Sequence, residues 1–126
     1  MRKILVVEDE NILREAYEMI LSTEPYVVDV AGNGKEAIDK CQQTQYDLVL
    51  LDIMMPVMNG IEFLQEMKKL SIRMPKIIVM SNLSSGKEIE DVLSLGAHST
   101  VLKSSLSPKQ LLMKVRFEVE TGEAVH

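Results

Sequence analysis

Residues 48–60 read Leu-Val-Leu-Leu-Asp-Ile-Met-Met-Pro-Val-Met-Asn-Gly, and the fold class follows from the start of this stretch. Four apolar residues, 48–51, come directly before Asp52. A continuous apolar run of this length is typical of a strand that is covered on both faces, as in a parallel sheet. We therefore predict a buried strand that ends at a carboxylate.

Four further runs share this form and predict four more strands, at residues 4–7, 27–31, 77–80 and 100–102. Between the runs, apolar residues recur at helical spacing. The predicted helical stripes consist of Ile12, Ala16, Met19 and Ile20; Ala37, Ile38 and Cys41; Ile61, Leu64 and Met67; Ile89, Val92 and Leu93; and Leu111, Leu112, Val115 and Val119. The alternation predicts an α/β fold of the (βα)5 type, with a doubly wound, five-stranded parallel sheet and right-handed crossovers.

Three local signals mark helix ends. Asn33 followed by Glu36 is typical of an N-cap with Glu at the third helical position. Ser107 before Pro108 is typical of a cap followed by a first-turn proline. Gly96 is predicted to stop the helix before it.

The composition is that of one globular domain. The length of 126 residues suits a single domain, and 46% apolar with 26% charged residues is ordinary for a soluble protein. The single cysteine, Cys41, excludes an internal disulfide and lies on an apolar helical face, so we expect it to be buried. Because no apolar stretch approaches the roughly 18 residues of a membrane span, we expect a cytoplasmic protein with no membrane partner.

The charge distribution bears on nucleic-acid binding. The net charge is −5, and Lys and Arg are scattered along the chain. Because a basic patch is the usual signature of nucleic-acid binding, we do not expect this chain to bind nucleic acid directly.

Reactive polar side chains follow four of the five predicted strands. Glu8 and Asp9 follow the first, Asp52 the third, Ser81 the fourth and Lys103 the fifth. In a parallel α/β sheet, ligands bind beyond the carboxyl ends of the strands, near the point where the strand order reverses. If the order is 2-1-3-4-5, three carboxylates meet there, flanked by a hydroxyl and an ammonium.

Carboxylates so close together repel one another unless a cation is present. Oxygen ligands favour a hard ion such as Mg²⁺ over zinc. The ammonium and the hydroxyl can then bind a phosphoryl group. Together with the cation and the carboxylates, these groups suit phosphoryl transfer. An aspartate carboxylate is a recognised nucleophile for such a group.

Taken together and in order, these residues resemble the receiver domain of two-component response regulators. The matching positions are Glu8-Asp9, residues 52–60, Ser81, Gly96-Ala97 and Lys103. The resemblance implies a flavodoxin-like fold with strand order 2-1-3-4-5. It implies a receiver domain over residues 1–120, followed by a polar tail at 121–126.

The resemblance also implies a role for each acid. Asp52 would be the phosphoacceptor, taking a phosphoryl group from the phosphohistidine of a sensor histidine kinase or histidine phosphotransfer protein, or from a small acyl phosphate. Asp9, Asp52 and the backbone carbonyl of Met54 would bind Mg²⁺ directly, and Glu8 would bind it through water. Pro56 would help to shape the loop after Asp52.

The remaining site residues include departures from the family. Ser81 and Lys103 would contact the phosphoryl oxygens, and Asn82, in place of a small residue, would restrict access to them. Ser104 stands where a proline, often cis, usually follows the lysine. Since a cis bond before a non-proline residue costs about 3 kcal/mol, the bond is expected to be trans, or cis under strain. Thr100 replaces a switch residue that is often aromatic.

The resemblance implies a switch and not an enzyme with an external substrate. Phosphorylation would bias a two-state equilibrium at the face formed by the fourth helix, the fifth strand and the fifth helix. Because Thr100 is small, we expect the loop after Ser81 and the helix at 88–95 to carry most of the change. An output partner, which the sequence does not identify, and a phosphorylation-dependent homodimer would use this face.

Two other interpretations compete with this one. Gly32-Asn33-Gly34-Lys35-Glu36-Ala37 matches a dinucleotide-binding pattern, but it follows the second strand and leaves the strand-end acids unexplained. A small Mg²⁺-dependent aspartyl-phosphate hydrolase would usually have a second acid two residues after the nucleophile. That position is Met54, which favours a switch.

Overall fold

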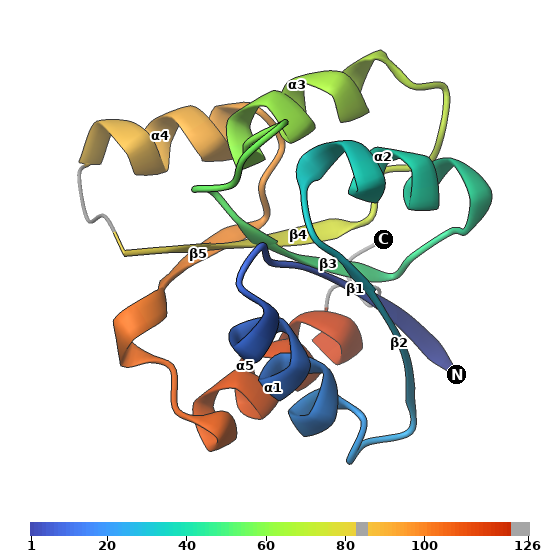
Figure 1. The fold of residues 1–126 in the computed structure, drawn as a ribbon, viewed down its shortest axis with the longest axis vertical. Coiled ribbons are helices and arrows are strands. Elements are labelled where there is room, and N and C mark those ends of the chain that lie inside the picture. Colours follow the sequence, from blue (N-terminus) through green and yellow to red (C-terminus); the bar gives the residue numbers. More distant parts are fainter. Residues whose placement is uncertain (83–85, 122–126) are drawn as a thin grey trace.

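The computed structural model describes residues 1–82 and 86–121, over which strands and helices alternate (Figure 1). The strands are β1 (Arg2–Val7), β2 (Tyr26–Ala31), β3 (Leu48–Asp52), β4 (Lys76–Ser81) and β5 (Ser99–Leu102). The helices are α1 (Asn11–Leu21), α2 (Gly34–Gln43), α3 (Gly60–Lys69), α4 (Gly86–Ser94) and α5 (Pro108–Thr121), with a short 3-10 helix, η1 (Lys103–Ser105), before α5. The (βα)5 prediction is confirmed.

The strands form one parallel sheet in the predicted order, β2-β1-β3-β4-β5. Helices α1 and α5 cover one face, and α2, α3 and α4 cover the other (Figure 1). The chain therefore leaves β1 toward one face and β3 toward the opposite face. This divergence opens a crevice at the carboxyl ends of these two neighbouring strands.

The buried middle of each central strand is apolar because successive side chains enter different layers of the core. In β1, Ile4 and Val6 pack with α1 and α5, whereas Leu5 and Val7 pack on the side of α2, α3 and α4. All four side chains are fully buried. A strand buried on both faces has no solvent side on which polar residues would alternate, as the sequence indicates.

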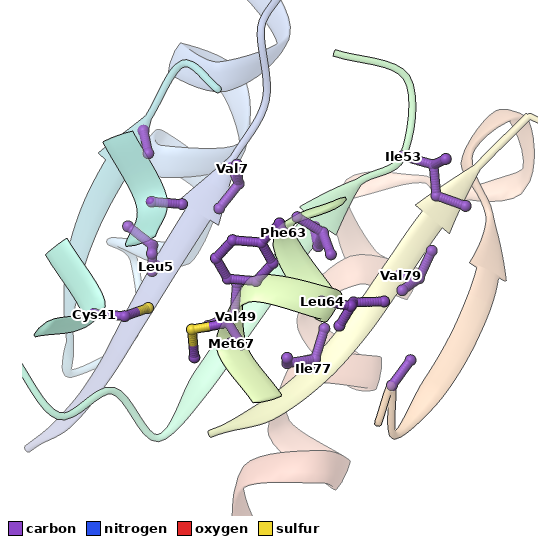
Figure 2. Packing of buried hydrophobic residues seen from close by; sticks show 14 of the residues in the cluster. Leu5, Val7, Cys41, Val49, Ile53, Phe63, Leu64, Met67, Ile77 and Val79 are labelled. Carbon is purple, nitrogen blue, oxygen red and sulfur yellow. The ribbon is translucent and has the colours of Figure 1, made fainter. Parts of the chain in front are cut away.

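Figure 2 shows the layer beneath α2, α3 and α4, where Phe63, Leu64 and Met67 project from α3 toward the strands. Met67 and Met80 are both fully buried and help to fill the core. Cys41 is buried in the same layer as Met67, and this burial raises the pKa of its thiol to about 11. A thiol with so high a pKa is unreactive at neutral pH.

The predicted inner face of α1 is correct at Ile20, which packs against the core, but it is wrong at Ile12 and Met19. Ile12 and Met19 are 83% and 72% exposed, and the helix instead packs through Tyr17 and Leu21. The two stripes are about one residue apart around the helix, and the one that includes the aromatic ring is buried, because it removes more apolar area from water. The stripe predicted on α4 is correct at Val92, but Leu93 is 42% exposed.

The predicted helix ends are confirmed. The Asn33 side chain accepts a hydrogen bond from the Glu36 N–H at 2.9 Å, and the Ser107 hydroxyl accepts one from the Gln110 N–H at 3.2 Å. Gly96 follows α4 with a φ of 110°, a left-handed conformation that ends helices and favours glycine. In the described part of the chain, no helix combines the length and the apolar character that crossing a membrane requires.

The predicted tail, residues 121–126, falls almost wholly outside the described residues. Thr121 is the last residue of α5. The boundary between domain and tail stays a prediction.

Gly60, at the start of α3, has no room for a side chain. A Cβ there would lie 2.8 Å from both the Asp52 carbonyl oxygen and the Ile53 Cα. Gly60→Ala should therefore lower the free energy of unfolding by about 1–3 kcal/mol, measured by urea denaturation. Gly86→Ala is the matched control, because a Cβ at this helix start meets nothing within 4 Å. Equal stability of the two variants would contradict this account of the loop.

Candidate functional site

Strands β1 and β3 bring the predicted acids together. Val7 pairs with Leu51 at the ends of the two strands, so Glu8 and Asp52 follow as neighbours. Glu8, Asp9 and Asp52 each offer a carboxylate oxygen, and these oxygens lie within 4.8 Å of one another. The predicted convergence of the three acids is present in the structure.

Glu8 is fully buried and is held from several sides. Its backbone N–H donates to the Ala31 carbonyl at 3.0 Å, which continues the ladder between β1 and β2. Its carbonyl accepts from the Arg14 guanidinium at 2.9 Å, and its side chain accepts from the Glu10 N–H at 3.2 Å. Burial raises the pKa of Glu8 to about 7, although bonds from Lys103 and the Glu10 N–H oppose the rise.

Asp52 ends β3 and is only 4% exposed. One carboxylate oxygen lies 3.4 Å from the Met54 N–H, and the other lies 3.2 Å from the Lys103 ammonium. Asp9, by contrast, is partly exposed. The cluster therefore has a buried side at Glu8 and Asp52 and an open side at Asp9.

Lys103 joins the ends of three strands. It follows β5 at the start of η1, and its ammonium lies 2.5 Å from Glu8 and 3.2 Å from Asp52. Burial would lower the pKa of Lys103, but the hydrogen bond to Glu8 and the charge of Asp52 outweigh this effect and raise it. The lysine is therefore cationic at neutral pH. The Lys103–Ser104 bond is trans, since the described residues contain no cis peptide bond.

Ser81 is buried at the end of β4, but its hydroxyl is engaged outside the carboxylate cluster. It donates to a Glu88 carboxylate oxygen on α4 at 2.9 Å. Thr100, at the position that lacks the aromatic, lines a cavity of about 90 Å³ together with Ser81 and Glu88. Asn82 is exposed and lines a separate hollow of about 390 Å³ that Lys103 also borders.

The loop after Asp52 is anchored to α2. The Gly34 N–H donates to the Met58 carbonyl at 3.0 Å, and a Cβ on Gly34 would come within 2.6 Å of that oxygen. The glycine-rich turn at 32–34 therefore packs against the loop of the site. This packing explains why a glycine is needed at position 34, so no dinucleotide-binding role has to be invoked. The Met54 side chain in the loop is exposed.

Sequence reasoning missed two residues that touch this site. Arg14 fixes the Glu8 carbonyl, and Glu88 accepts from Ser81. Arg14 is six residues from its partner and Glu88 is seven, and no motif marks either pair. The predicted change in the loop after Ser81 falls partly on residues 83–85, which lie outside the described residues.

The donor set fits a hard divalent cation. Three carboxylates face one ammonium, so the cluster holds excess negative charge, and its ligand atoms are oxygens. Such a set suits Mg²⁺ better than a metal that prefers nitrogen or sulfur. An acid at the end of β3, a neighbouring cation site and a fixed lysine are the groups that a phosphoryl acceptor requires.

Comparison with known proteins agrees with this geometry. The family model of the response regulator receiver domain matches residues 4–116. The chain is 37% identical to a transcriptional regulatory protein CpxR homolog of Haemophilus influenzae over 118 residues, which are 92% of this chain and 49% of that protein. The chain spans between about a quarter and a half of the length of the curated relatives it matches.

Solved structures show the same likeness. A CheY-like response regulator receiver domain protein from Methanospirillum hungatei superposes with a TM-score of 0.90 at 28% identity, covering 100% of this chain and 99% of that one. The response regulator TrrA from Thermotoga maritima, solved in complex with Mg²⁺-BeF, has a TM-score of 0.79 at 37% identity, covering 94% and 99%. The chain belongs to the response regulator receiver domain family, and it is a phosphoaccepting switch of two-component signalling.

The burial of Glu8 generates a prediction about pH. In metal-free protein, its carboxyl should titrate with a midpoint near the pKa of about 7, because burial favours the neutral form. Carbon-13 NMR of the side-chain carboxyl measures this midpoint, and Glu8→Gln serves to assign the signal. Since Mg²⁺ favours the charged form, adding it should move the midpoint to lower pH. A Glu8 midpoint near its ordinary 4.5 would contradict the prediction.

Proposed function

We propose that Asp52 is the phosphoryl acceptor of this receiver domain. The observation that carries the proposal is the placement of its buried carboxylate, 3.2 Å from the Lys103 ammonium and within 4.8 Å of carboxylate oxygens of Glu8 and Asp9. In the step, an Asp52 oxygen attacks the phosphorus of a donor phosphohistidine. The phosphorus–nitrogen bond breaks, its electron pair returns to the imidazole, and an acyl phosphate remains on Asp52.

The same proposal gives the metal ligands. Asp9, Asp52 and the Met54 carbonyl would hold one Mg²⁺, and Glu8 would reach it through water. The bound ion supplies positive charge to the phosphoryl oxygens. Because Lys103 is already fixed between two strand ends, it stabilises the oxygens that gain charge without rearranging.

The phosphoryl donor and the effects of phosphorylation are proposed from membership in the receiver domain family. A sensor histidine kinase or a histidine phosphotransfer protein supplies the phosphoryl group, and a small acyl phosphate can replace it. Ser81 and Lys103 contact the phosphoryl oxygens, and Asn82 limits access to them. Phosphorylation shifts the face formed by α4, β5 and α5, where an output partner or a second copy of the domain binds.

The domain acts on itself and not on external substrates. Two residues after Asp52, where a hydrolase would usually have a second acid, the chain has Met54. A cytoplasmic location and the absence of direct nucleic-acid or membrane contacts stay predictions.

Asp52→Asn should abolish labelling by acetyl phosphate and Mg²⁺, because an amide is not a nucleophile toward phosphorus. Intact-protein mass spectrometry should detect one added phosphoryl group on wild type and none on the variant. Asp39→Asn, an exposed change on α2, is the control and should label normally. Normal labelling of Asp52→Asn would mean that another residue is the acceptor.

Asp9→Asn should weaken Mg²⁺ binding at least tenfold, because it removes one of the few charged ligands of a hard ion. Isothermal titration calorimetry measures the affinity, and circular dichroism checks that the variant stays folded. The fold should persist because Asp9 lies on the open side of the cluster. Unchanged affinity would remove Asp9 from the ligand set.

A further inference from the structure

The hydrogen bond between Ser81 and Glu88 connects the end of β4 to the first turn of α4. The Ser81 hydroxyl donates to the Glu88 carboxylate at 2.9 Å, across seven residues of sequence. Ser81 is buried, whereas Glu88 is partly exposed. The bond therefore links a fixed strand end to a helix that starts nearby.

We propose that Glu88 competes with the phosphoryl group for the Ser81 hydroxyl, and so acts as a positioning residue that sets how readily the domain becomes phosphorylated. This inference rests on the function proposed above for Asp52 and Ser81. A serine hydroxyl has one proton to donate. While Glu88 accepts that proton, a phosphoryl oxygen cannot.

Charge repulsion between the Glu88 carboxylate and the phosphoryl group adds to the competition for the Ser81 hydroxyl. A phosphoryl oxygen that accepts from Ser81 has to approach the serine oxygen closely, and Glu88 now holds an oxygen 2.9 Å from it. A phosphoryl group carries a charge of about −1.5 to −2 at neutral pH, so it repels a carboxylate at this distance. Phosphorylation therefore favours departure of the Glu88 side chain.

The Glu88 side chain borders open space into which it can move when it releases Ser81. It borders the cavity of about 90 Å³ with Ser81 and Thr100, and it also borders an open groove of about 480 Å³ beside Met54 and Asn59. In that groove the carboxylate can be hydrated, so its release does not strand a buried charge. The side chain can move from Ser81 to solvent without leaving α4.

The move would alter the start of α4 more than its end. Val92 is buried against the core and holds the later turns of the helix. Glu88 lies in the first turn, where its bond to Ser81 is a direct tie to the sheet. Thr100 on β5 stands where receiver domains often have an aromatic switch residue, and its side chain is small. We therefore propose the Ser81–Glu88 pair as the link between the phosphorylation site and α4.

Titration with beryllofluoride in the presence of Mg²⁺, followed by amide NMR, tests the competition. Glu88→Ala should bind the mimic at least about fivefold more tightly than wild type, because a hydrogen bond of ordinary net strength provides that factor and the loss of a repelling charge adds to it. Glu88→Gln keeps an acceptor but loses the charge, so its gain should be smaller. Glu90→Ala, an exposed change on the same helix, is the matched control and should bind like wild type.

A double-mutant cycle separates competition from a general loosening of α4. In a Ser81→Ala background, Glu88→Ala should raise the affinity clearly less than it does in wild type, because no hydroxyl is left to release and only the charge repulsion is removed. An equal gain in that background, or no gain in wild type, would overturn the inference while leaving Asp52 as the acceptor. If wild type itself takes up no beryllofluoride, the proposed function fails and the inference fails with it.

Discussion

The ion contacts of Lys103 with Glu8 and Asp52 are the constraint on which the site depends. They tie together the ends of β1, β3 and β5, at distances of 2.5 and 3.2 Å. One ammonium cannot neutralise three carboxylates, so the cluster keeps excess negative charge in a place where burial disfavours it. The fold thereby maintains a site that gains stability when a cation arrives, and this is the physical basis of the proposed metal-dependent switch.

The surroundings of the cluster hold it in place through backbone contacts. Arg14 fixes the Glu8 carbonyl, and the Gly34 N–H fixes the Met58 carbonyl in the loop after Asp52. On the far side, Ser81 is tied to Glu88 on α4. The acids are thus supported from α1 and α2, and the Ser81–Glu88 hydrogen bond connects the end of β4 to α4. In the proposed switch, a change of charge at Asp52 would reach α4 through this hydrogen bond.

Much of this arrangement could be predicted from the sequence, because buried parallel strands produce continuous apolar runs and residues at their ends share one edge of the sheet. The position of Asp52 after residues 48–51 is such a case. The inner face of α1 could not be predicted, since two apolar stripes compete and only packing chooses Tyr17 over Met19. The partner of Ser81 could not be predicted either. Glu88 reaches it through the placement of α4, which depends on the whole sheet.

A crystal structure of the domain with Mg²⁺ and beryllofluoride tests the central claim most directly. We expect one Mg²⁺ with oxygens of Asp9, Asp52 and the Met54 carbonyl at about 2.1 Å. We also expect beryllium on Asp52, with the Lys103 ammonium bonded to a fluoride. A metal bound elsewhere, or a mimic that leaves Asp52 and Lys103 untouched at saturating concentrations, would contradict it.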